Sequence, residues 1–393
     1  MTTLGLWQFA HEVCVGDVIF AKQGLKKIVG RGEVISDAFF DDARAQYKNV
    51  RRVNWTDTGV WDCPGQIPAK TLTDITRLTA YVRRLEALFA SDLDAPLPAS
   101  PPDVWPPYTP EEFLSDVYIG RDQYDTLCNL LLRKKNIILQ GAPGVGKTFT
   151  ARRLAYSLME EKDASRVMMV QFHQSLSYED FVMGYRPSEA GFTLEEGPFY
   201  EFCDRAREDS DRPYFFVIDE INRGNLSKVF GELLMLIESD KRGAEHALRL
   251  MYRDEQFWVP ENLYIIGMMN TADRSLALID YALRRRFAFF DMVPAFESDG
   301  FRKHQRTLAS PRFDALVREV EALNRAISED SSLGPGFRIG HSYLCSDDLV
   351  DDQFLQSVVA YEIEPLLQEY WFDHLESAAH WGDRLRAAVS SRG

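Results

Sequence analysis

The chain has 393 residues, of which 45% are hydrophobic and 27% charged, a composition typical of a soluble globular protein with two or three compact units. Its net charge of −15 argues against broad, non-specific nucleic-acid binding by the whole protein. No apolar stretch is long enough to span a membrane and no signal-peptide pattern is present, so we expect a cytoplasmic location. The five cysteines form no Cys-x-x-Cys pair, and we expect reduced thiols.

Residues 1–90 form the first predicted domain. They carry a net charge of +2 while the remainder carries −17, which leaves room for a small nucleic-acid reader. Short apolar runs separated by turn residues predict strands, and a helical pattern follows them: the strands are Val15–Ala21, Lys27–Val34 and Val50–Trp55, and the helix is Thr73–Phe89. This pattern predicts a small, partly closed β-barrel with attached helices.

Residues 91–110 form a predicted linker. Seven of the 18 prolines fall between positions 96 and 110, and such a density favours extended backbone over helix. The linker therefore separates the first domain from the rest of the chain.

Residues 111–295 alternate strand-like and helical patterns, which predicts an α/β core with a parallel sheet. The predicted strands are Ile137–Gln140, Val167–Phe172, Tyr214–Ile218, Tyr264–Met269 and Phe287–Met292. Residues 296–393 are helical in pattern and predict a lid, with helices at Phe313–Ser328, Asp351–Tyr370 and Leu375–Ser390.

The first chemical motif is a Gly-x-x-x-x-Gly-Lys-Thr phosphate loop between a predicted strand and a predicted helix. Its glycines let backbone N–H groups face phosphate oxygens at a helix N-terminus. We expect Lys147 to contact the outer phosphates and Thr148 to offer its hydroxyl to Mg²⁺. The nucleotide-binding residues of the loop are Gly141, Ala142, Pro143, Gly144, Val145, Gly146, Lys147 and Thr148.

A second motif supplies two adjacent carboxylates at the end of the apolar run Phe215–Ile218. We expect Asp219 to hold the metal and Glu220 to act as the general base for water; an exposed turn is the alternative. Asn270 ends a further apolar run and is a candidate to fix the attacking water, unless it only caps the next turn.

Three consecutive arginines follow a predicted short helix over Leu276–Leu283. In a ring of subunits, Arg284 or Arg285 is a candidate arginine finger that reaches the γ-phosphate of the neighbouring subunit. A solvated basic helix end is the alternative. Further along, Arg338 and His341 are expected near the lid, with Arg338 a candidate γ-phosphate sensor.

At these residues the chain resembles the AAA+ superfamily, and more narrowly the McrB-like motor subunits of modification-dependent restriction systems. The matching stretches include GAPGVGKTFTARRLA, FFVIDEINRGNLSKVFGELLMLIE and MMNTADRSLALIDYALRRRFAFF. The resemblance implies an AAA+ P-loop NTPase that forms a hexameric ring and hydrolyses GTP at subunit interfaces. The stretch Asn270 to Asp273 has the Asn-x-x-Asp outline of a guanine reader, but it lacks the Lys of ordinary GTPases, and ATP stays open.

Residues 1–90 resemble EVE-type members of the PUA-like β-barrels, on Gly16–Ile19, Gly30–Val34 and Val50–Trp55. The resemblance implies a domain that binds modified double-stranded DNA and stacks a flipped base in an aromatic pocket. Most buried aromatic rings are core residues, so we expect only one or two candidates to line such a pocket. The candidates are Trp7, Phe39, Phe40, Trp55 and Trp61.

No nuclease constellation is evident: Glu160-Glu161-Lys162 has a Glu-x-Lys outline but no partner Asp on a suitable strand. We therefore expect a nucleoside-triphosphatase that is not itself a nuclease, and the resemblance implies an McrC-like endonuclease subunit as its partner. Two rival functions stay open at this point. One is an ATP-dependent, MoxR-like remodeller of proteins, and the other is a nucleotide-switched module in defence signalling.

Overall fold

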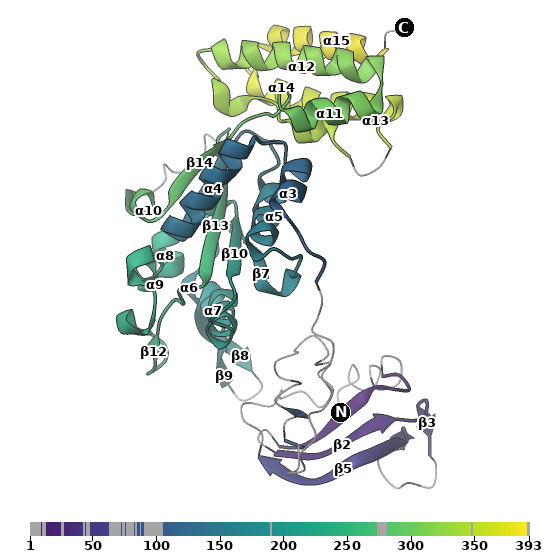
Figure 1. Ribbon diagram of the computed structural model, residues 1–393, viewed down its shortest axis with the longest axis vertical. Helices are drawn as coiled ribbons and strands as arrows, with labels where there is room; N and C mark the ends of the chain where they lie inside the picture. The colour runs from purple at the N-terminus through teal and green to yellow at the C-terminus, as the bar shows by residue number, and fades with distance from the viewer. Residues whose placement is uncertain are drawn as a thin grey trace. The chain divides into compact units, whose positions relative to one another are not determined.

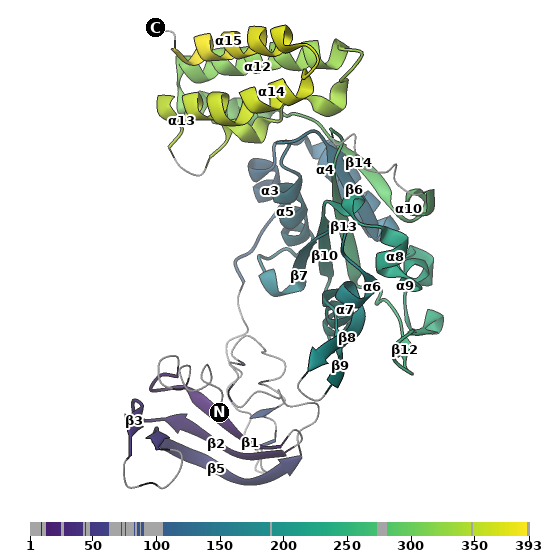
Figure 2. The ribbon, with the colours of Figure 1, turned by 180° about the vertical axis from the view of Figure 1, so that it is seen from behind.

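The computed structural model describes residues 9, 13–24, 27–41, 44, 48–62, 72, 75, 82, 85–86, 88–89, 105–188, 191–272, 281–346 and 349–390. The chain divides into two compact units, residues 1–102 and 103–393. Figure 1 shows the elements of both units, and Figure 2 shows them from behind. No helix in the described part of the chain is long and apolar enough to cross a membrane.

The first unit is mostly β, as predicted. An antiparallel sheet has the order β1-β2-β5, and a separate ribbon pairs β3 with β4: β1 is Val18–Gln23, β2 Lys27–Val34, β3 Phe39–Phe40, β4 Asn49–Val50 and β5 Val53–Asp62. Ile28 and Leu85 form its buried centre. Within the residues described for this unit the sheet is open, and no closed barrel is formed. Most of the predicted helix over 73–89 lies outside those residues.

Two strand boundaries in this unit differ from the prediction. The first strand begins at Val18 because Gly16 has a φ of 98°, which belongs to a turn. The predicted strand Val50–Trp55 is instead split, and β5 continues to Asp62 through turn-forming residues. Pairing with β2, with register shifts that accommodate the mismatch, overrides the turn propensity of that segment.

The second unit is built on a five-stranded parallel sheet of order β14-β6-β13-β10-β7. The strands are β6 Asn136–Gly141, β7 Val167–Gln171, β10 Tyr214–Asp219, β13 Leu263–Asn270 and β14 Ala288–Met292. All five predicted core strands are present, with ends shifted by one residue at most. Their carboxyl ends meet at one edge of the sheet, where ligands bind in open parallel sheets.

Helices cover both faces of this sheet because its strands are apolar on both faces (Figures 1 and 2). Ile137 and Leu139 pack with α4 and α5, whereas Ile138 packs with α6 and α7. The helices of this layer are α3 Pro110–Asp116, α4 Arg121–Lys134, α5 Lys147–Met159, α6 Tyr178–Phe181, α7 Pro198–Glu208, α8 Leu226–Phe230, α9 Leu233–Leu236 and α10 Tyr281–Arg286. Tyr108, near the end of the predicted linker, is 1% exposed and packs in this unit.

The second unit also contains smaller elements. One hairpin pairs β8 (Met183–Ser188) with β9 (Gly191–Glu196), and a second pairs β11 (Leu248–Arg249) with β12 (Gln256–Phe257). Single 3₁₀ turns lie at Ala164–Arg166, Ile221–Arg223, Ser239–Lys241, Ala244–His246, Pro335–Phe337 and His341–Leu344.

The lid is a helical layer with its own apolar core. Its helices are α11 Asp299–Leu308, α12 Pro311–Glu329, α13 Asp352–Ser357, α14 Glu364–Tyr370 and α15 Leu375–Ser390, with a π-helical turn at Val358–Ile363 that joins α13 to α14. Ser298 and Ser310 cap the amino-terminal ends of α11 and α12, because each hydroxyl accepts a hydrogen bond from a backbone N–H of the first turn. The predicted helix over 351–370 is thus one helical run with a wider turn in its middle.

Candidate functional site

The phosphate loop joins β6 to α5, and its shape depends on glycine. Gly144 and Gly146 have φ values of 75° and 79°, in the left-handed region where residues with a Cβ are strained. A Cβ on Gly141 would lie 2.2 Å from the carbonyl oxygen of Met292. A glycine loop that leads into a helix N-terminus is an arrangement that binds phosphate.

Lys147 is the first residue of α5, and its side chain folds back over the loop. Its Nζ donates hydrogen bonds to the carbonyl oxygens of Gly141 and Ala142, at 3.1 and 3.0 Å. Burial lowers the pKa of Lys147 to about 8, although the nearby carboxylates of Glu220 and Asp219 act in the opposite direction. The ammonium group is therefore partly desolvated and close to both acidic residues.

The acidic pair stands at the carboxyl end of β10. Asp219 is the last residue of the strand, and its Oδ1 accepts a hydrogen bond from the backbone N–H of Glu220 at 3.0 Å. Glu220 has a φ of 51°, a conformation that is uncommon for a residue with a side chain. Strained backbone of this kind often lies at functional sites. The two carboxylates leave the sheet edge in a sharply turned segment.

Asn270 ends β13, the strand that lies between β6 and β10. On one side Asn270 pairs with Gly141 of the phosphate loop strand. On the other side its Nδ2 donates a hydrogen bond of 2.7 Å to Oε1 of Glu220. The other oxygen of Glu220, Oε2, lies 3.2 Å from Nε of Arg223. The structure thus brings the predicted base and the predicted water-fixing amide into direct contact.

Thr148 is exposed at the start of α5. Arg284 and Arg285 are exposed on α10, whereas Arg286 is held within the chain by an ion pair of 2.9 Å with Glu238. Asp273 lies outside the described residues.

The lid contacts the phosphate loop through its backbone. The N–H of Gly340 donates to the carbonyl oxygen of Pro143 at 3.1 Å, and that of Ser342 donates to Gly144 at 2.8 Å. A Cβ on Gly340 would lie 1.9 Å from the carbonyl carbon of Gly144, so no other residue fits at this approach. The lid segment and the phosphate loop are therefore closely joined.

Thr271 links the phosphate loop, β13 and the lid. Its N–H donates to the carbonyl oxygen of Gly141 at 3.1 Å, and its Oγ1 donates to the carbonyl oxygen of Gly336 at 3.0 Å. Sequence reasoning missed Thr271, Gly336 and Gly340. The repeated glycines of the segment GFRIGH were the one available signal for a close backbone approach.

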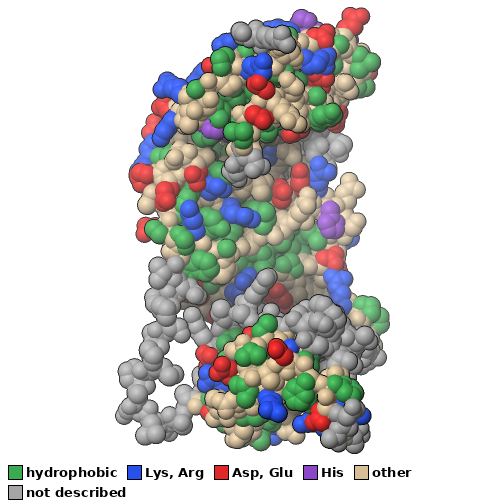
Figure 3. Space-filling view, turned by 90° about the vertical axis from the view of Figure 1, so that its right-hand side faces the viewer, with side chains coloured by type: hydrophobic (Ala, Val, Ile, Leu, Met, Phe, Trp, Pro, Cys, Tyr) green, Lys and Arg blue, Asp and Glu red, His purple; other side chains and the backbone are tan. Residues whose placement is uncertain are grey.

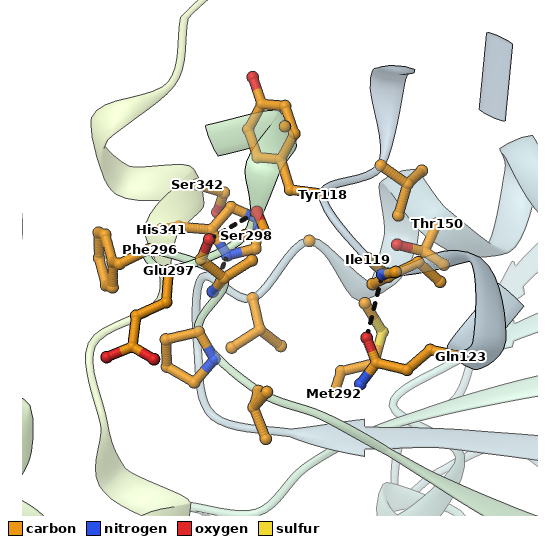
Figure 4. Close-up of a pocket in the computed structure, with 18 of the residues that line it drawn as sticks. Tyr118, Ile119, Gln123, Thr150, Met292, Phe296, Glu297, Ser298, His341 and Ser342 are labelled. Carbon is orange, nitrogen blue, oxygen red and sulfur yellow. Dashed lines mark hydrogen bonds between the residues drawn. The ribbon is translucent and has the colours of Figure 1, made fainter. Parts of the chain in front are cut away.

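A cavity of about 1400 Å³ adjoins the phosphate loop, between the core and the lid. Figure 4 shows Tyr118 and Ile119 entering it from the α3–α4 link, Thr150 from α5, and His341 and Ser342 from the lid. Arg338 also lines this cavity, and its Nε donates to the carbonyl oxygen of Pro335 at 3.0 Å. The volume exceeds that of many small-ligand pockets and suits a nucleotide.

His341 is neutral in this cavity. Burial lowers its pKa to about 4, and its Nδ1 accepts a hydrogen bond of 3.1 Å from the N–H of Ala295. The proton of the neutral ring is therefore assigned to Nε2. This atom would lie 3.9 Å from a Cβ placed on Gly146. The ring thus offers one N–H donor beside the phosphate loop at neutral pH.

The described aromatic candidates of the first unit differ in their exposure. Phe39, Phe40 and Trp55 are 41%, 60% and 44% exposed. Trp61 instead packs edge-on against Phe89, with ring centroids 4.6 Å apart, which is a contact of the small core. Trp7 lies outside the described residues.

Substituting Gly340 by Ala should separate the lid segment from the phosphate loop, because the new methyl group overlaps Gly144. We expect a loss of at least about 2 kcal/mol in unfolding free energy and weaker triphosphate binding, measured by thermal unfolding and calorimetry. Gly382→Ala on α15 is the control, since a Cβ on Gly382 would lie 3.5 Å from the nearest atoms of Glu364, an ordinary contact distance. An unchanged nucleotide Kd for Gly340→Ala would refute this role of the lid contact.

Triphosphate binding should take up a proton above about pH 8. The phosphates raise the pKa of Lys147 from about 8 in the free protein, so affinity is full below that pH and falls by up to about tenfold per pH unit above it. Calorimetry at pH 8.5 in two buffers of different ionisation enthalpy measures the uptake. Lys303→Ala should keep it because Lys303 is exposed on α11. Equal heats in both buffers would contradict the assignment.

Comparison with family models divides the chain into three parts. Residues 136–287 match the AAA domain (dynein-related subfamily), residues 315–379 match the McrB alpha-helical lid domain, and residues 2–81 match a domain of unknown function, DUF8426. The first match contains four of the five strands of the parallel sheet, and the second lies within the lid described above.

Two curated proteins are similar to the chain. The type IV methyl-directed restriction enzyme EcoKMcrB subunit of Escherichia coli (strain K12) is 52% identical over 288 residues, which cover 71% of this chain and 63% of that protein. The type II restriction enzyme BsuMI component YdiS of Bacillus subtilis (strain 168) is 23% identical over 254 residues, 52% of this chain and 72% of that protein. The chain thus spans less than two thirds of the E. coli protein. Together with the phosphate loop and the acidic pair, these matches show that the chain contains an AAA domain and an McrB-type helical lid, and that it is similar to the McrB subunit of a restriction enzyme.

Proposed function

We propose that this chain hydrolyses GTP in a hexameric ring of identical subunits and drives a separate McrC-like endonuclease in modification-dependent restriction. The observation that carries the catalytic part is the 2.7 Å hydrogen bond from Asn270 to Glu220 at the sheet edge beside the phosphate loop. The restriction context is supported by the similar E. coli and B. subtilis proteins, both of which are restriction components.

In this mechanism the outer phosphates bind to the phosphate loop and to the ammonium group of Lys147. Glu220 accepts a proton from the attacking water, and Asn270 holds the orientation of the carboxylate through its hydrogen bond to Oε1. Glu220 is suited to this task because its side chain is only 15% exposed, so bulk water competes little for it.

The donor atoms at the loop fit Mg²⁺, which prefers oxygen ligands and usually shares its coordination with substrate phosphates. The hydroxyl of Thr148 and the carboxylate of Asp219 would hold it. When bound, the ion would neutralise charge on the phosphates.

We place the base and ribose in the cavity between the core and the lid, because it adjoins Gly146 and is lined by apolar core residues such as Ile119 and Met292 and by mostly polar residues of the lid. We favour GTP over ATP on the resemblance to McrB-like proteins, with ATP as the alternative substrate. The proposed reader Asp273 would add a polar contact to guanine.

The first unit is the proposed reader of modified DNA, of the EVE or PUA-like type. On the face of the core and lid in Figure 3, acidic and basic side chains are interspersed among the described residues, without a continuous basic surface. In the first unit exposed rings lie beside cations, as the exposed Phe149 lies beside Arg153 in the core. The guanidinium of Arg52 lies 5.8 Å from the centroid of Phe39, and Nζ of Lys48 lies 5.5 Å from that of Phe40. In such a pair the ring can stack on a base and the cation can contact a phosphate group.

A separate polypeptide is the proposed nuclease. Glu160, the acidic residue of the Glu-x-Lys outline in the sequence, is the exposed C-cap residue of α5. The proposed partner is an endonuclease subunit of the McrC type.

Glu220→Gln should lower the GTP hydrolysis rate by about 100-fold or more and leave the Kd for GTP near its wild-type value, because only the proton acceptor is lost. Steady-state phosphate release and calorimetry measure the two quantities, with ATP tested in parallel. Glu376→Gln, an exposed change on α15, is the charge-matched control. Wild-type turnover in Glu220→Gln would remove the general base from this mechanism.

The double variant Phe40→Ala, Arg52→Ala should weaken binding of methylated or hydroxymethylated duplex DNA by about 5- to 100-fold, because stacking and one phosphate contact are lost. Fluorescence anisotropy at fixed salt measures this with the full chain. Val60→Ala, another exposed apolar residue of the first unit, should bind as the wild type does. If the wild-type protein itself shows no preference for modified over plain DNA, a protein remodeller becomes the better description.

A further inference from the structure

A buried arginine lies at the amino-terminal edge of the sheet, away from the nucleotide site. Arg242 is 3% exposed, and its hydrogen bonds go to neutral oxygen atoms: Nε donates to the carbonyl of Ile237 at 3.0 Å, and Nη1 donates to those of Leu263 at 3.1 Å and Pro260 at 3.4 Å. Nη2 donates to Oδ1 of Asn136 at 2.7 Å. Such a satisfied network fixes the orientation of the Asn136 amide.

Asn136 in turn holds the end of α10. Its side chain is fully buried at the first position of β6, and its Nδ2 donates to the carbonyl oxygens of Ile237 at 2.7 Å and Arg286 at 3.1 Å. The carbonyl of Arg286 belongs to the last residue of α10. One end of this helix is therefore tied to the sheet.

The side chain of Arg286 forms a second contact that holds this end of α10. Nη2 of Arg286 lies 2.9 Å from Oε1 of Glu238, and the two side chains are only 17% and 15% exposed. A partly buried pair of this kind is more effective than a surface pair, because solvent screens it less. Arg286 is thus held through its backbone by Asn136 and through its side chain by Glu238.

The contacts that hold Arg286 also affect the two exposed arginines that precede it. The helix α10 has six residues, too few to be stable alone, so contacts at its ends must set its direction. Arg284 and Arg285 precede the fixed residue directly and are exposed. A shift at Arg286 would therefore move both guanidinium groups.

We propose that Glu238 and Asn136 are positioning residues that hold Arg286, so that α10 presents Arg284 and Arg285 to the nucleotide of the neighbouring subunit. This inference rests on the proposed ring with catalytic arginines. Asn136 and Gly141 are five residues apart along β6, about 17 Å. Disturbing the anchor should therefore affect the neighbour's site and spare the subunit's own.

The test uses full-length chains with Glu238→Gln, which keeps the side-chain shape and removes the charge. Alone, this variant should lose about 10- to 100-fold in kcat, as expected for a misplaced catalytic group, with KM and the Kd for GTP unchanged. Mixed with an excess of Lys147→Ala chains, which supply intact arginines but lack the phosphate-binding lysine, the Glu238→Gln subunits should regain turnover. Glu245→Gln, whose carboxylate is 67% exposed, is the matched control and should behave as wild type.

The variant Arg284→Ala, Arg285→Ala in the same mixtures separates two kinds of failure. If this double variant alone hydrolyses GTP at the wild-type rate, the arginine part of the proposed function is wrong, and the inference falls with it. If the double variant is inactive and rescued by mixing while Glu238→Gln is fully active, only the positioning role is wrong. A Glu238→Gln chain that is inactive and not rescued by mixing would also overturn the inference, because its defect would lie in its own site.

Discussion

The nucleotide site depends on the place of β13 between β6 and β10. Because the three strands run parallel, their carboxyl ends reach the same edge, with Gly141, Asn270 and Asp219 as their last residues. Asn270 can then pair with Gly141 through its backbone and donate to Glu220 through its side chain. In a sheet with another strand order, the phosphate loop and Glu220 would be further apart, and the side-chain amide of Asn270 could not join them.

Close backbone approach is the second constraint, and glycine makes it possible. The lid segment lies so near the phosphate loop that a side chain on Gly340 would overlap Gly144, and two backbone hydrogen bonds cross between them. Thr271 adds a contact from β13 to the same lid segment. A group that displaces the loop must therefore also displace the lid or break these bonds. Such coupling is what a motor needs if hydrolysis is to change the position of its lid.

The carboxyl and amino edges of the five-stranded sheet have different roles in the proposed function. Its carboxyl edge carries the groups for phosphate and water, and its amino edge anchors α10 through Arg242, Asn136 and Glu238. In the first unit, exposed rings lie beside cations. In the proposed function, phosphate chemistry, contact with a neighbouring subunit and DNA reading are thus assigned to distinct parts of the chain.

The sequence by itself predicted the core strands, the lid helices apart from α11, and the phosphate and acidic motifs, because apolar periodicity and loop spacing are local properties. It misplaced β5, since pairing with β2 and its register shifts, rather than local propensity, decide where that strand ends. Only the tertiary structure decided that Arg286 is held inside the chain while Arg284 and Arg285 are exposed, and that Gly340 meets the phosphate loop. The physical reason is distance along the chain: Asn136 and Arg286 are 150 residues apart, and no local pattern reports a contact of that kind.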